Sequence, residues 1–427
     1  MQNRRSLQNR RQFMKTSALA TTASVLSLAP AVHAGGKDEI RVGLIGCGGR
    51  GPGAGQQAAN TGSPVRITAL ADAFPDRLNS CKKTLKDNLG EKYAVTEKNC
   101  FVGLDAYKGV IASDVDVVLL ATSPHFRPIH FKAVVEAGKH CFVEKPMATD
   151  APGCRSMLES VRVAQQKNLA VVAGFCWRYH NAMREMFRRI HEGDIGEILT
   201  MEANYITGTL WHVPKTPDLT DMEWQLRNWL YFTCLSGDHI CEQTIHTIDK
   251  ITWAMKNTYP KFAVGMGGRQ VRTGPEFGHI YDHHAVAYEY DNGVKAYCFT
   301  RQMKNCFSDN SFHVYGTKGS AHWKNNRWQI KGQKPWQAAR DLAADDMYQH
   351  EHNELFDSIR SGKPINDGDW MVKSTLTGIM GRMACYTGKR IEWEQAMNSK
   401  EDLTPPSYTL KEFPTPPVAM PGITPFV

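Results

Sequence analysis

Short apolar runs alternate with longer amphipathic stretches through the first 175 residues of the chain. Each run has the length and composition of a buried parallel strand, and polar residues with helical spacing follow it. The runs occupy residues 41–45, 65–71, 115–121, 140–143 and 169–175. This alternation predicts an α/β domain with a doubly wound parallel sheet, which we assign to residues 35–175.

The pattern changes after residue 176, where alternating apolar and polar residues become common. An amphipathic helix is expected at 182–192, and a strand at 198–205 opens a second sheet. Later strands are expected at 282–290, 295–302, 311–315 and 321–331, with a hairpin turn at Asn292-Gly293. Residues 176–400 therefore predict an α+β domain with a large, mostly antiparallel, open sheet. Further helices are expected at 350–361, packed back towards the first domain, and at 374–386.

Both ends of the chain depart from these patterns. Residues 401–427 contain seven prolines and predict an extended arm that lies along this subunit or a neighbouring one. Residues 1–34 carry Arg10-Arg11, then a weakly apolar run rich in hydroxyl groups, then Val32-His33-Ala34. This order resembles a twin-arginine export signal cleaved after Ala34, and predicts a periplasmic or secreted protein with no membrane segment in its mature form. The alternative is a basic membrane anchor, for which the run is short.

The charge and the cysteines narrow the class of protein. The net charge is +8, and the five basic residues of the leader leave only +3 for the rest, too mild for a nucleic-acid partner. The eleven cysteines show no C-x-x-C pair and no zinc spacing. We expect buried free thiols in a protein that folds in the reducing cytoplasm before export.

The first apolar run leads into a G-x-G-x-x-G motif at Gly46, Gly48 and Gly51. In a dinucleotide fold the first glycine allows the tight turn, the second lets the backbone approach a pyrophosphate, and the third lets the helix pack closely. Asp72 ends the second run about twenty residues later, where a carboxylate binds the ribose hydroxyls. Asp72 favours NAD over NADP because it repels a 2′-phosphate, although Arg77 lies nearby. The alternative is an ordinary tight turn between strand and helix.

Two later runs end in residues that should also face the cofactor, since ligands bind beyond the carboxyl ends of parallel strands. The run at 140–143 ends in Glu144-Lys145-Pro146. A desolvated lysine there can transfer a proton or polarise a substrate oxygen, and the alternative is a surface Lys–Glu pair. The residues predicted to bind the cofactor are Gly46, Gly48, Gly49, Arg50, Gly51, Asp72, Thr122, Ser123, Pro124, His125, Glu144 and Lys145.

The glycine motif, Asp72 and Glu144-Lys145-Pro146 together resemble the Gfo/Idh/MocA oxidoreductases, a family that includes glucose–fructose oxidoreductase and inositol dehydrogenase. The resemblance extends over nearly the whole chain after the leader. It implies a Rossmann domain that binds NAD, and a Lys145 that contacts substrate and nicotinamide and assists proton transfer. It also implies that Arg178 and Tyr179 lie near cofactor and substrate; the alternative for them is packing at the domain junction.

Residues 242–255 have helical spacing and carry a second chemical group. Glu242 and His246 are four residues apart on one helix face, so the carboxylate can orient the imidazole for proton abstraction. The resemblance implies that His246 is the family's catalytic histidine, with Glu242 in place of the usual Asp and Asp249 in register. Glu242 and Asp249 are expected to orient His246 or to bind substrate hydroxyls. The alternative for His246 is a half-buried, satisfied side chain.

His239 is an additional imidazole before this helix and a candidate substrate contact. Two sets of side chains could be written as metal ligands, but neither has a firm ligand spacing, and hydride chemistry with NAD needs no metal. We therefore predict no metal site. The two sets are His239, Glu242 and His246, and Asp282, His283 and His284.

Residues 207–229 are rich in Trp, Pro and polar residues and have no clear period. They predict a long excursion from the second sheet that roofs the substrate site. Trp211, Trp224 and Trp229 either stack on sugar rings or form a hydrophobic plug at an oligomer interface, and the sequence favours neither.

Together these features predict an NAD(P)-dependent oxidoreductase, with tightly bound NAD, that acts on a sugar, polyol or glycoside. The substrate hydroxyl would lie between His246, which removes its proton, and Lys145, which stabilises negative charge on the oxygen. One alternative is a glycoside hydrolase that recycles its NAD, which suits an exported protein because free NAD is scarce outside the cytoplasm. The other is a non-catalytic sugar-binding protein. A homo-oligomer, either dimer or tetramer, is expected.

Overall fold

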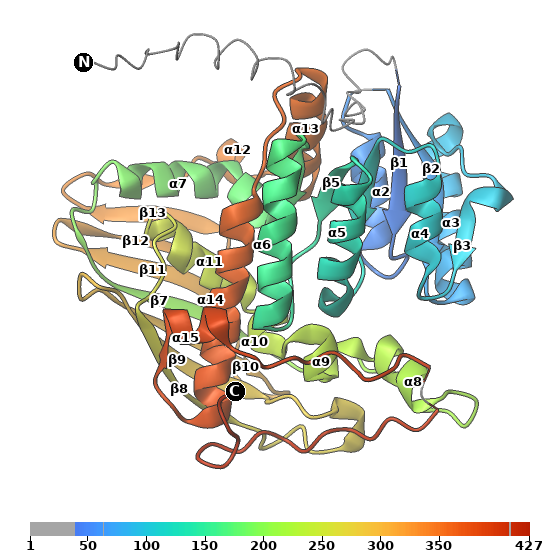
Figure 1. The fold of residues 1–427 in the computed structure, drawn as a ribbon. Coiled ribbons are helices and arrows are strands. Elements are labelled where there is room, and N and C mark those ends of the chain that lie inside the picture. Colours follow the sequence, from blue (N-terminus) through green and yellow to red (C-terminus); the bar gives the residue numbers. More distant parts are fainter. Residues whose placement is uncertain (1–38, 63, 410) are drawn as a thin grey trace, which may run out of the picture. The chain divides into compact units, whose positions relative to one another are not determined.

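The computed structural model describes residues 39–62, 64–409 and 411–427, and Figure 1 shows their arrangement. The twin-arginine pattern of residues 1–34 lies outside the described residues, so export stays a prediction. The strands of the described residues form two sheets, and the strand order in each gives the fold class.

The first sheet has six strands in the order β3-β2-β1-β4-β5-β6, and every neighbouring pair is parallel. This is the strand order of a Rossmann domain and confirms the prediction from the alternating pattern. The strands are β1 (Ile40–Ile45), β2 (Val65–Asp72), β3 (Cys100–Val102), β4 (Val117–Leu120), β5 (His140–Val143) and β6 (Val171–Ala173). The helices are α2 (Gly51–Ala59), α3 (Pro75–Leu89), α4 (Ala106–Ala112), α5 (Arg127–Glu136) and α6 (Ala151–Gln166).

Alternate side chains of the first sheet enter two different cores, because successive residues of a strand point to opposite faces. Ile45 and Leu120 pack with residues of α4, α5 and α6 on one face. Leu44 and Leu119 pack with residues of α2 and α3 on the other, where α13 (Met347–Arg360) also contributes. The predicted return of a late helix to the first domain is therefore confirmed.

The second sheet has nine strands in the order β14-β13-β12-β11-β7-β10-β9-β8-β15. Only the β7–β10 pair is parallel among the pairings of the described strands, so the mostly antiparallel sheet is confirmed. Its strands are β7 (Ile198–Thr207), β8 (Phe262–Gly268), β9 (His283–Glu289), β10 (Lys295–Gln302), β11 (Asp309–Gly316), β12 (Gly319–Lys324), β13 (Arg327–Gly332), β14 (Trp336–Gln337) and β15 (Ile391–Glu392).

Helices cover one face of the second sheet and leave the other open. α14 (Gly368–Thr387) packs on β8 and β9, and α14 also runs beside α6 of the Rossmann domain (Figure 1). On β10, Ala296 and Cys298 are buried, whereas Tyr297 and Phe299 are each 39% exposed on the open face. The other helices are α7 (Asn181–His191), α8 (Asp221–Arg227), α9 (Thr233–Ser236), α10 (His239–Glu242), α11 (Ile245–Ala254), α12 (Arg340–Ala343) and α15 (Trp393–Asn398).

Two of the predicted elements are divided in the structure. The helix expected at 242–255 is interrupted, because α10 ends at Glu242 and α11 begins at Ile245. At the break, the Thr244 backbone N–H donates to the His239 carbonyl and its hydroxyl donates to Thr300. The segment at 321–331, expected to add at least one more strand, forms the hairpin of β12 and β13, which turns at Asn325 and Asn326 with positive φ angles that asparagine tolerates.

The proline-rich arm, residues 401–427, lies along its own chain. The Tyr281 hydroxyl donates to the Ala419 carbonyl at 2.9 Å, and the Gly422 N–H donates to the Thr387 carbonyl at 3.0 Å.

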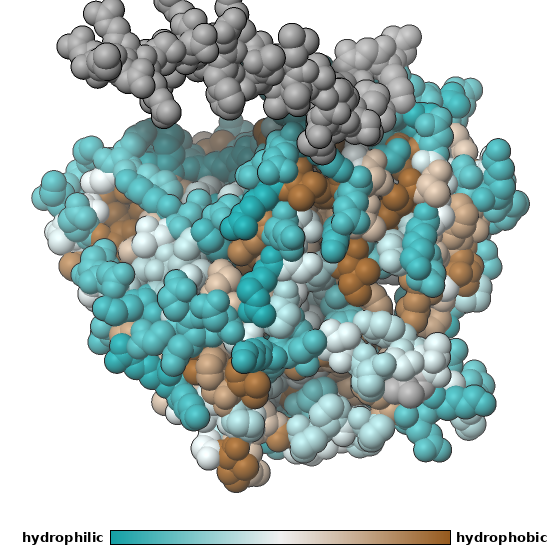
Figure 2. Space-filling model, in the orientation of Figure 1, coloured by the Kyte–Doolittle hydropathy of each residue, from teal (hydrophilic) through white to brown (hydrophobic). Residues whose placement is uncertain are grey.

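In the view of Figure 2, apolar residues form small separate patches among polar ones. Among the described helices, none combines the length and the apolar character needed to cross a membrane. All eleven cysteines lie in the described part and are free thiols, eight of them buried, as predicted.

Candidate active site

A cavity of about 620 Å³ lies at the carboxyl ends of β1, β2 and β4. This volume falls in the range of cavities that hold a small ligand or cofactor. Of the residues predicted to bind the cofactor, those that line the cavity are Gly46, Gly48, Gly49, Arg50, Asp72, Thr122 and Ser123. The predicted residues outside this lining are Gly51, Pro124, His125, Glu144 and Lys145.

The glycine loop has the shape that a pyrophosphate needs. A Cβ added at Gly48 or Gly49 would meet nothing within 4 Å, so the backbone there is open to the cavity. A Cβ at Gly46 would lie 2.6 Å from the backbone of Ala121, and one at Gly51 would lie 2.0 Å from the Gly46 carbonyl oxygen. The outer glycines therefore permit close packing and the inner ones leave room for a ligand, and the N-terminal N–H groups of α2 follow directly.

Asp72 is fixed at the end of β2 with its carboxylate at the cavity. One oxygen accepts from the Cys47 N–H at 2.6 Å, and the other accepts from the Phe74 N–H at 2.9 Å. Burial raises the pKa of this carboxyl group. The glycine cradle and this carboxylate fit a dinucleotide with free ribose hydroxyls.

Arg50 connects the glycine loop to two carboxylates. Its Nε lies 2.6 Å from Glu144 Oε1, and its Nη2 lies 3.1 Å from Glu351 Oε1 on α13. Burial, together with the charge of Glu144, raises the pKa of Glu351 well above its ordinary value. Glu351 was not predicted, because a single acid on an amphipathic helix carries no sign of its distant partner.

Lys145 follows β5 and meets Glu242 at the end of α10. Its Nζ donates to Glu242 Oε1 and to the Glu242 carbonyl oxygen, both at 2.7 Å. The other carboxylate oxygen of Glu242 accepts from Gln243 Nε2 at 2.6 Å. The expected contact between Glu242 and His246 is therefore replaced by one to Lys145, because the break between α10 and α11 separates the two side chains.

His246 lies in the first turn of α11, and its Nδ1 is buried with no hydrogen-bond partner in the described residues. Burial, and then the nearby charges of Lys145 and Lys250, hold the pKa of His246 well below its ordinary value. The imidazole is therefore neutral at physiological pH, which is the state that a general base requires. Lys250 Nζ donates to the His246 carbonyl at 2.8 Å and lies over the rings of Trp177 and Trp323, which pack edge to face.

Arg178 and Asp249, both predicted as substrate contacts, pair with each other inside the protein, and for Arg178 this fits the alternative of packing at the domain junction. The Arg178 guanidinium donates to both Asp249 oxygens and lies 3.7 Å over the Trp370 ring. Asp249 also accepts from the Ser374 hydroxyl at 2.8 Å, so it does not orient His246. The Tyr179 hydroxyl likewise donates to Asp367 at 2.6 Å. These groups are satisfied at the junction between the domains.

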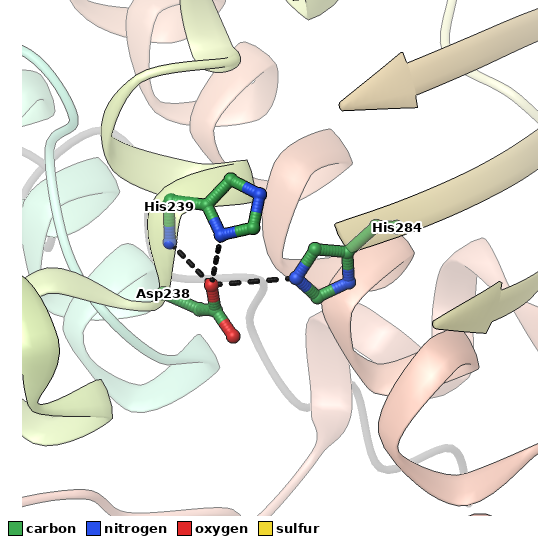
Figure 3. Close-up of side chains that lie close together, drawn as sticks. All are labelled: Asp238, His239 and His284. Carbon is green, nitrogen blue, oxygen red and sulfur yellow. Dashed lines mark hydrogen bonds and ion pairs between the residues drawn. The ribbon is translucent and has the colours of Figure 1, made fainter. Parts of the chain in front are cut away.

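His239, also predicted to contact substrate, is fully buried in a cluster with Asp238 and His284 (Figure 3). One Asp238 oxygen lies 2.9 Å from His239 Nδ1 and 3.3 Å from His284 Nε2. The other accepts from the Tyr281 N–H and the Tyr386 hydroxyl. Three potential ligand atoms lie within 4.8 Å of one another here, but these donors already satisfy the carboxylate. The cluster joins α10 to β9 and holds His239 inside the protein, so a contact between His239 and substrate stays a prediction.

The excursion at 207–229 forms one wall of the cofactor cavity, through Trp211, Arg227 and Trp229. Trp224 is instead buried in a separate core with Leu230 and neighbouring residues. The sequence offered sugar stacking or an oligomer plug for these tryptophans, and the structure places two of them at the cofactor cavity. From the sequence, this segment was predicted to roof the substrate site, but not which of its tryptophans would reach the cofactor cavity.

Comparison with known proteins identifies the family. Residues 40–175 match the model described as the oxidoreductase family, NAD-binding Rossmann fold, and residues 183–322 match the Gfo/Idh/MocA C-terminal domain. A glycosyl hydrolase family 109 protein of Shewanella amazonensis is 31% identical over 225 residues, 48% of each chain. The chain thus spans about half the length of that relative. Inositol 2-dehydrogenase of Salmonella typhimurium is 24% identical over 76% of this chain and 87% of its own.

Solved structures support the fold. An aldose-aldose oxidoreductase from Caulobacter crescentus has a TM-score of 0.65 at 18% identity, covering 83% of this chain and 99% of its own. A levoglucosan dehydrogenase complexed with NADH and levoglucosan has a TM-score of 0.64 at 16% identity, with the same coverage. The two family matches span the Rossmann domain and most of the second sheet. The chain therefore belongs to the Gfo/Idh/MocA family of oxidoreductases and carries its NAD-binding Rossmann domain.

Proposed function

We propose that this protein is an NAD-dependent dehydrogenase that acts on a hydroxyl group of a sugar, polyol or glycoside. The observation that carries the proposal is that Lys145 pairs with Glu242 and that its charge acts on His246. Lys145 follows β5, and the neighbouring strand β4 ends at the cofactor cavity. Similarity to an inositol 2-dehydrogenase and to a levoglucosan dehydrogenase supports a substrate with several hydroxyl groups.

In the proposed reaction, His246, Lys145 and Glu242 have different roles. NAD, when bound, supplies the hydride acceptor. The neutral imidazole of His246 accepts the proton of the substrate hydroxyl, and the ammonium group of Lys145 donates a hydrogen bond to the same oxygen and stabilises its negative charge. Glu242 holds Lys145 in place before substrate arrives, so it acts as the positioning residue of the lysine.

A second candidate is a glycoside hydrolase that reuses its NAD and produces no net oxidation. The observation that favours it is the 31% identity to a glycosyl hydrolase family 109 protein. The third possibility, a non-catalytic sugar-binding protein, is disfavoured because it would have no need for both Lys145 and a neutral, buried His246.

We also propose that the protein is exported and forms a homo-oligomer. The first proposal is supported by Arg10-Arg11 and the residues up to Ala34. The second is supported by the open face of the second sheet, where Met266 is 73% exposed beside exposed Tyr297 and Phe299. Fractionation of the native host and light scattering of the purified protein test these two proposals separately.

One experiment separates the candidate functions. Purified protein without its first 34 residues is denatured, the released small molecule is identified by mass spectrometry, and intact protein is assayed with free sugars plus NAD and with chromogenic glycosides without added NAD. Reduction of added NAD by a free sugar supports the dehydrogenase. Release of the chromophore without added NAD supports the hydrolase. Failure to bind nicotinamide in any form contradicts both.

A further inference from the structure

The cofactor cavity is built from both domains. Asp72, Phe74 and Arg77 contribute its wall at the end of β2, and Trp211 and Arg227 of the excursion face the same cavity from the second domain. The excursion is inserted between β7 and α9, so its position over the Rossmann domain does not follow from the second sheet alone. Specific contacts must therefore hold it there.

One of these contacts is an ion pair between Arg227, at the end of α8, and the half-exposed Asp76, in the first turn of α3. The guanidinium donates to both carboxylate oxygens, at 2.7 and 2.9 Å, in the paired geometry that arginine favours. It also lies 4.0 Å over the ring of Phe74. The bond to Arg227 lowers the pKa of Asp76, so the carboxylate is charged under physiological conditions. Phe74 and Asp76 lie two and four residues after Asp72. The Arg227–Asp76 ion pair is therefore near the carboxylate that is expected to bind the ribose.

The proline-rich arm holds the excursion from its other side. The Phe413 N–H donates to Asp221 at 2.8 Å, and Gln225 Nε2 donates to the Phe413 carbonyl at 2.8 Å, so α8 is tied to the arm at its first residue and at an interior one. Nearer the start of the arm, the Tyr408 hydroxyl lies 2.6 Å from Nε2 of His125, which follows β4. The excursion is thus fixed between the Rossmann domain and the C-terminal arm.

We propose that the excursion and the arm form an intramolecular clasp that retains NAD between turnovers, with the Arg227–Asp76 ion pair as its latch. The proposal rests on the proposed function only in that the cavity holds NAD. For the cofactor to leave, the latch must break and Trp211 and Trp229 must withdraw from the cavity. A clasp of this kind makes release slow, which suits an enzyme that works where little free NAD is present.

The test measures exchange of bound NAD, so it needs no substrate. Protein without its first 34 residues is saturated with NAD, mixed with excess isotope-labelled NAD, desalted at intervals and analysed by mass spectrometry for the bound form. The variants are Arg227→Ala, Asp76→Asn and the charge swap Arg227→Asp with Asp76→Arg. The control is Arg188→Ala, which breaks a two-glutamate pairing on the surface of α7.

Both single variants should exchange NAD about 3–10-fold faster than the unmodified protein, because changes at an interface alter mainly the dissociation rate. The charge swap should restore slow exchange, and Arg188→Ala should exchange at the unmodified rate. Tyr408→Phe should also accelerate exchange, because it removes the hydrogen bond between the arm and His125. These results would support the clasp.

Three outcomes contradict the proposal, and they differ in which other conclusions they contradict. If NAD binds and Arg227→Ala exchanges at the rate of the unmodified protein, the clasp is wrong while the dehydrogenase proposal stands. If the unmodified protein binds no NAD after saturation, both proposals are wrong. A charge swap that remains as fast as the single variants would show that Arg227 acts through some other contact.

Discussion

The Lys145 ammonium nitrogen lies 2.7 Å from Glu242 Oε1 and 2.7 Å from the Glu242 carbonyl oxygen. Both side chains are largely shielded from water, so the hydrogen bond between them is charge-assisted and strong. Glu242 bonds to Lys145, whereas the Nδ1 of His246 has no hydrogen-bond partner in the described residues and burial lowers the pKa of its imidazole. The two proposed proton-handling groups are therefore positioned by different neighbours, and their roles can be tested one at a time.

Replacement of Lys145 by Met, or of His246 by Gln, should reduce turnover by about 10²–10⁴-fold, the usual contribution of a positioned acid or base. NAD affinity should change little, because neither residue lines the cofactor cavity. Steady-state kinetics together with titration of NAD by fluorescence check both statements. Unchanged turnover in both variants would remove the proposed site.

Replacement of Lys250 by Met should move the acid limb of the pH–rate profile to higher pH. Lys250 lies next to His246, and its positive charge opposes protonation of the imidazole, so its removal raises the pKa of His246. Burial lowers the pKa of Lys250 to about 7, so this residue is charged at the acid pH values where His246 titrates. Exposed Lys261→Met serves as the control and should leave the limb in place. A limb that stays fixed, or moves to lower pH, in Lys250→Met contradicts this account.

Replacement of Arg178 by Met should destabilise the protein by about 3–5 kcal/mol, because it leaves the buried carboxylate of Asp249 without its cation. Denaturant unfolding measures this loss. Arg188→Ala, at a pair with about half of each side chain exposed, should change the stability far less, because water and salt screen exposed ion pairs. If Arg178→Met were as stable as Arg188→Ala and instead raised the KM for substrate, the original prediction of a substrate contact would be restored.

His279 should make the protein less stable in acid. Burial lowers its pKa in the folded protein to about 4, whereas an unfolded histidine titrates near 6.5. Between these values the unfolded chain binds one more proton, so this contribution to stability is present above about pH 6.5 and is lost as the pH falls towards 4. In His279→Gln, the slope of unfolding free energy against pH between 4.5 and 6 should fall by about 1.4 kcal/mol per pH unit. Equal slopes in variant and parent would show that His279 does not titrate this way.

Replacement of Asp72 by Ser should weaken NAD binding and reduce discrimination against NADP. The carboxylate occupies the position that binds ribose hydroxyls and repels a 2′-phosphate, while Arg77 lines the same cavity. Calorimetric titration of each cofactor should show about a tenfold smaller preference for NAD, roughly 1.4 kcal/mol. If the preference for NAD over NADP did not change, a residue other than Asp72 would select the cofactor. Arg77 would then be the first residue to examine.

Those parts of the site that depend on a single strand and the turn after it could be predicted from the sequence. Gly46, Gly48 and Gly51 have steric requirements within a few residues, and Lys145 follows a buried strand whose apolar composition is evident. Parallel strands then bring these segments to one edge of the sheet. This reasoning, with the apolar patterns, also predicted the type of both sheets, although strands β3, β8, β14 and β15 were not predicted.

The partner of each buried polar side chain was decided by the tertiary structure alone. Glu242 is four residues from His246 but bonds to Lys145, 97 positions away, because a break between two helices turns it aside. Arg227 pairs with Asp76 across 151 positions. Hydrophobic periodicity tells which face of an element is buried, since that depends on local spacing. It carries no information on which distant charge will lie opposite, because packing of whole elements decides that.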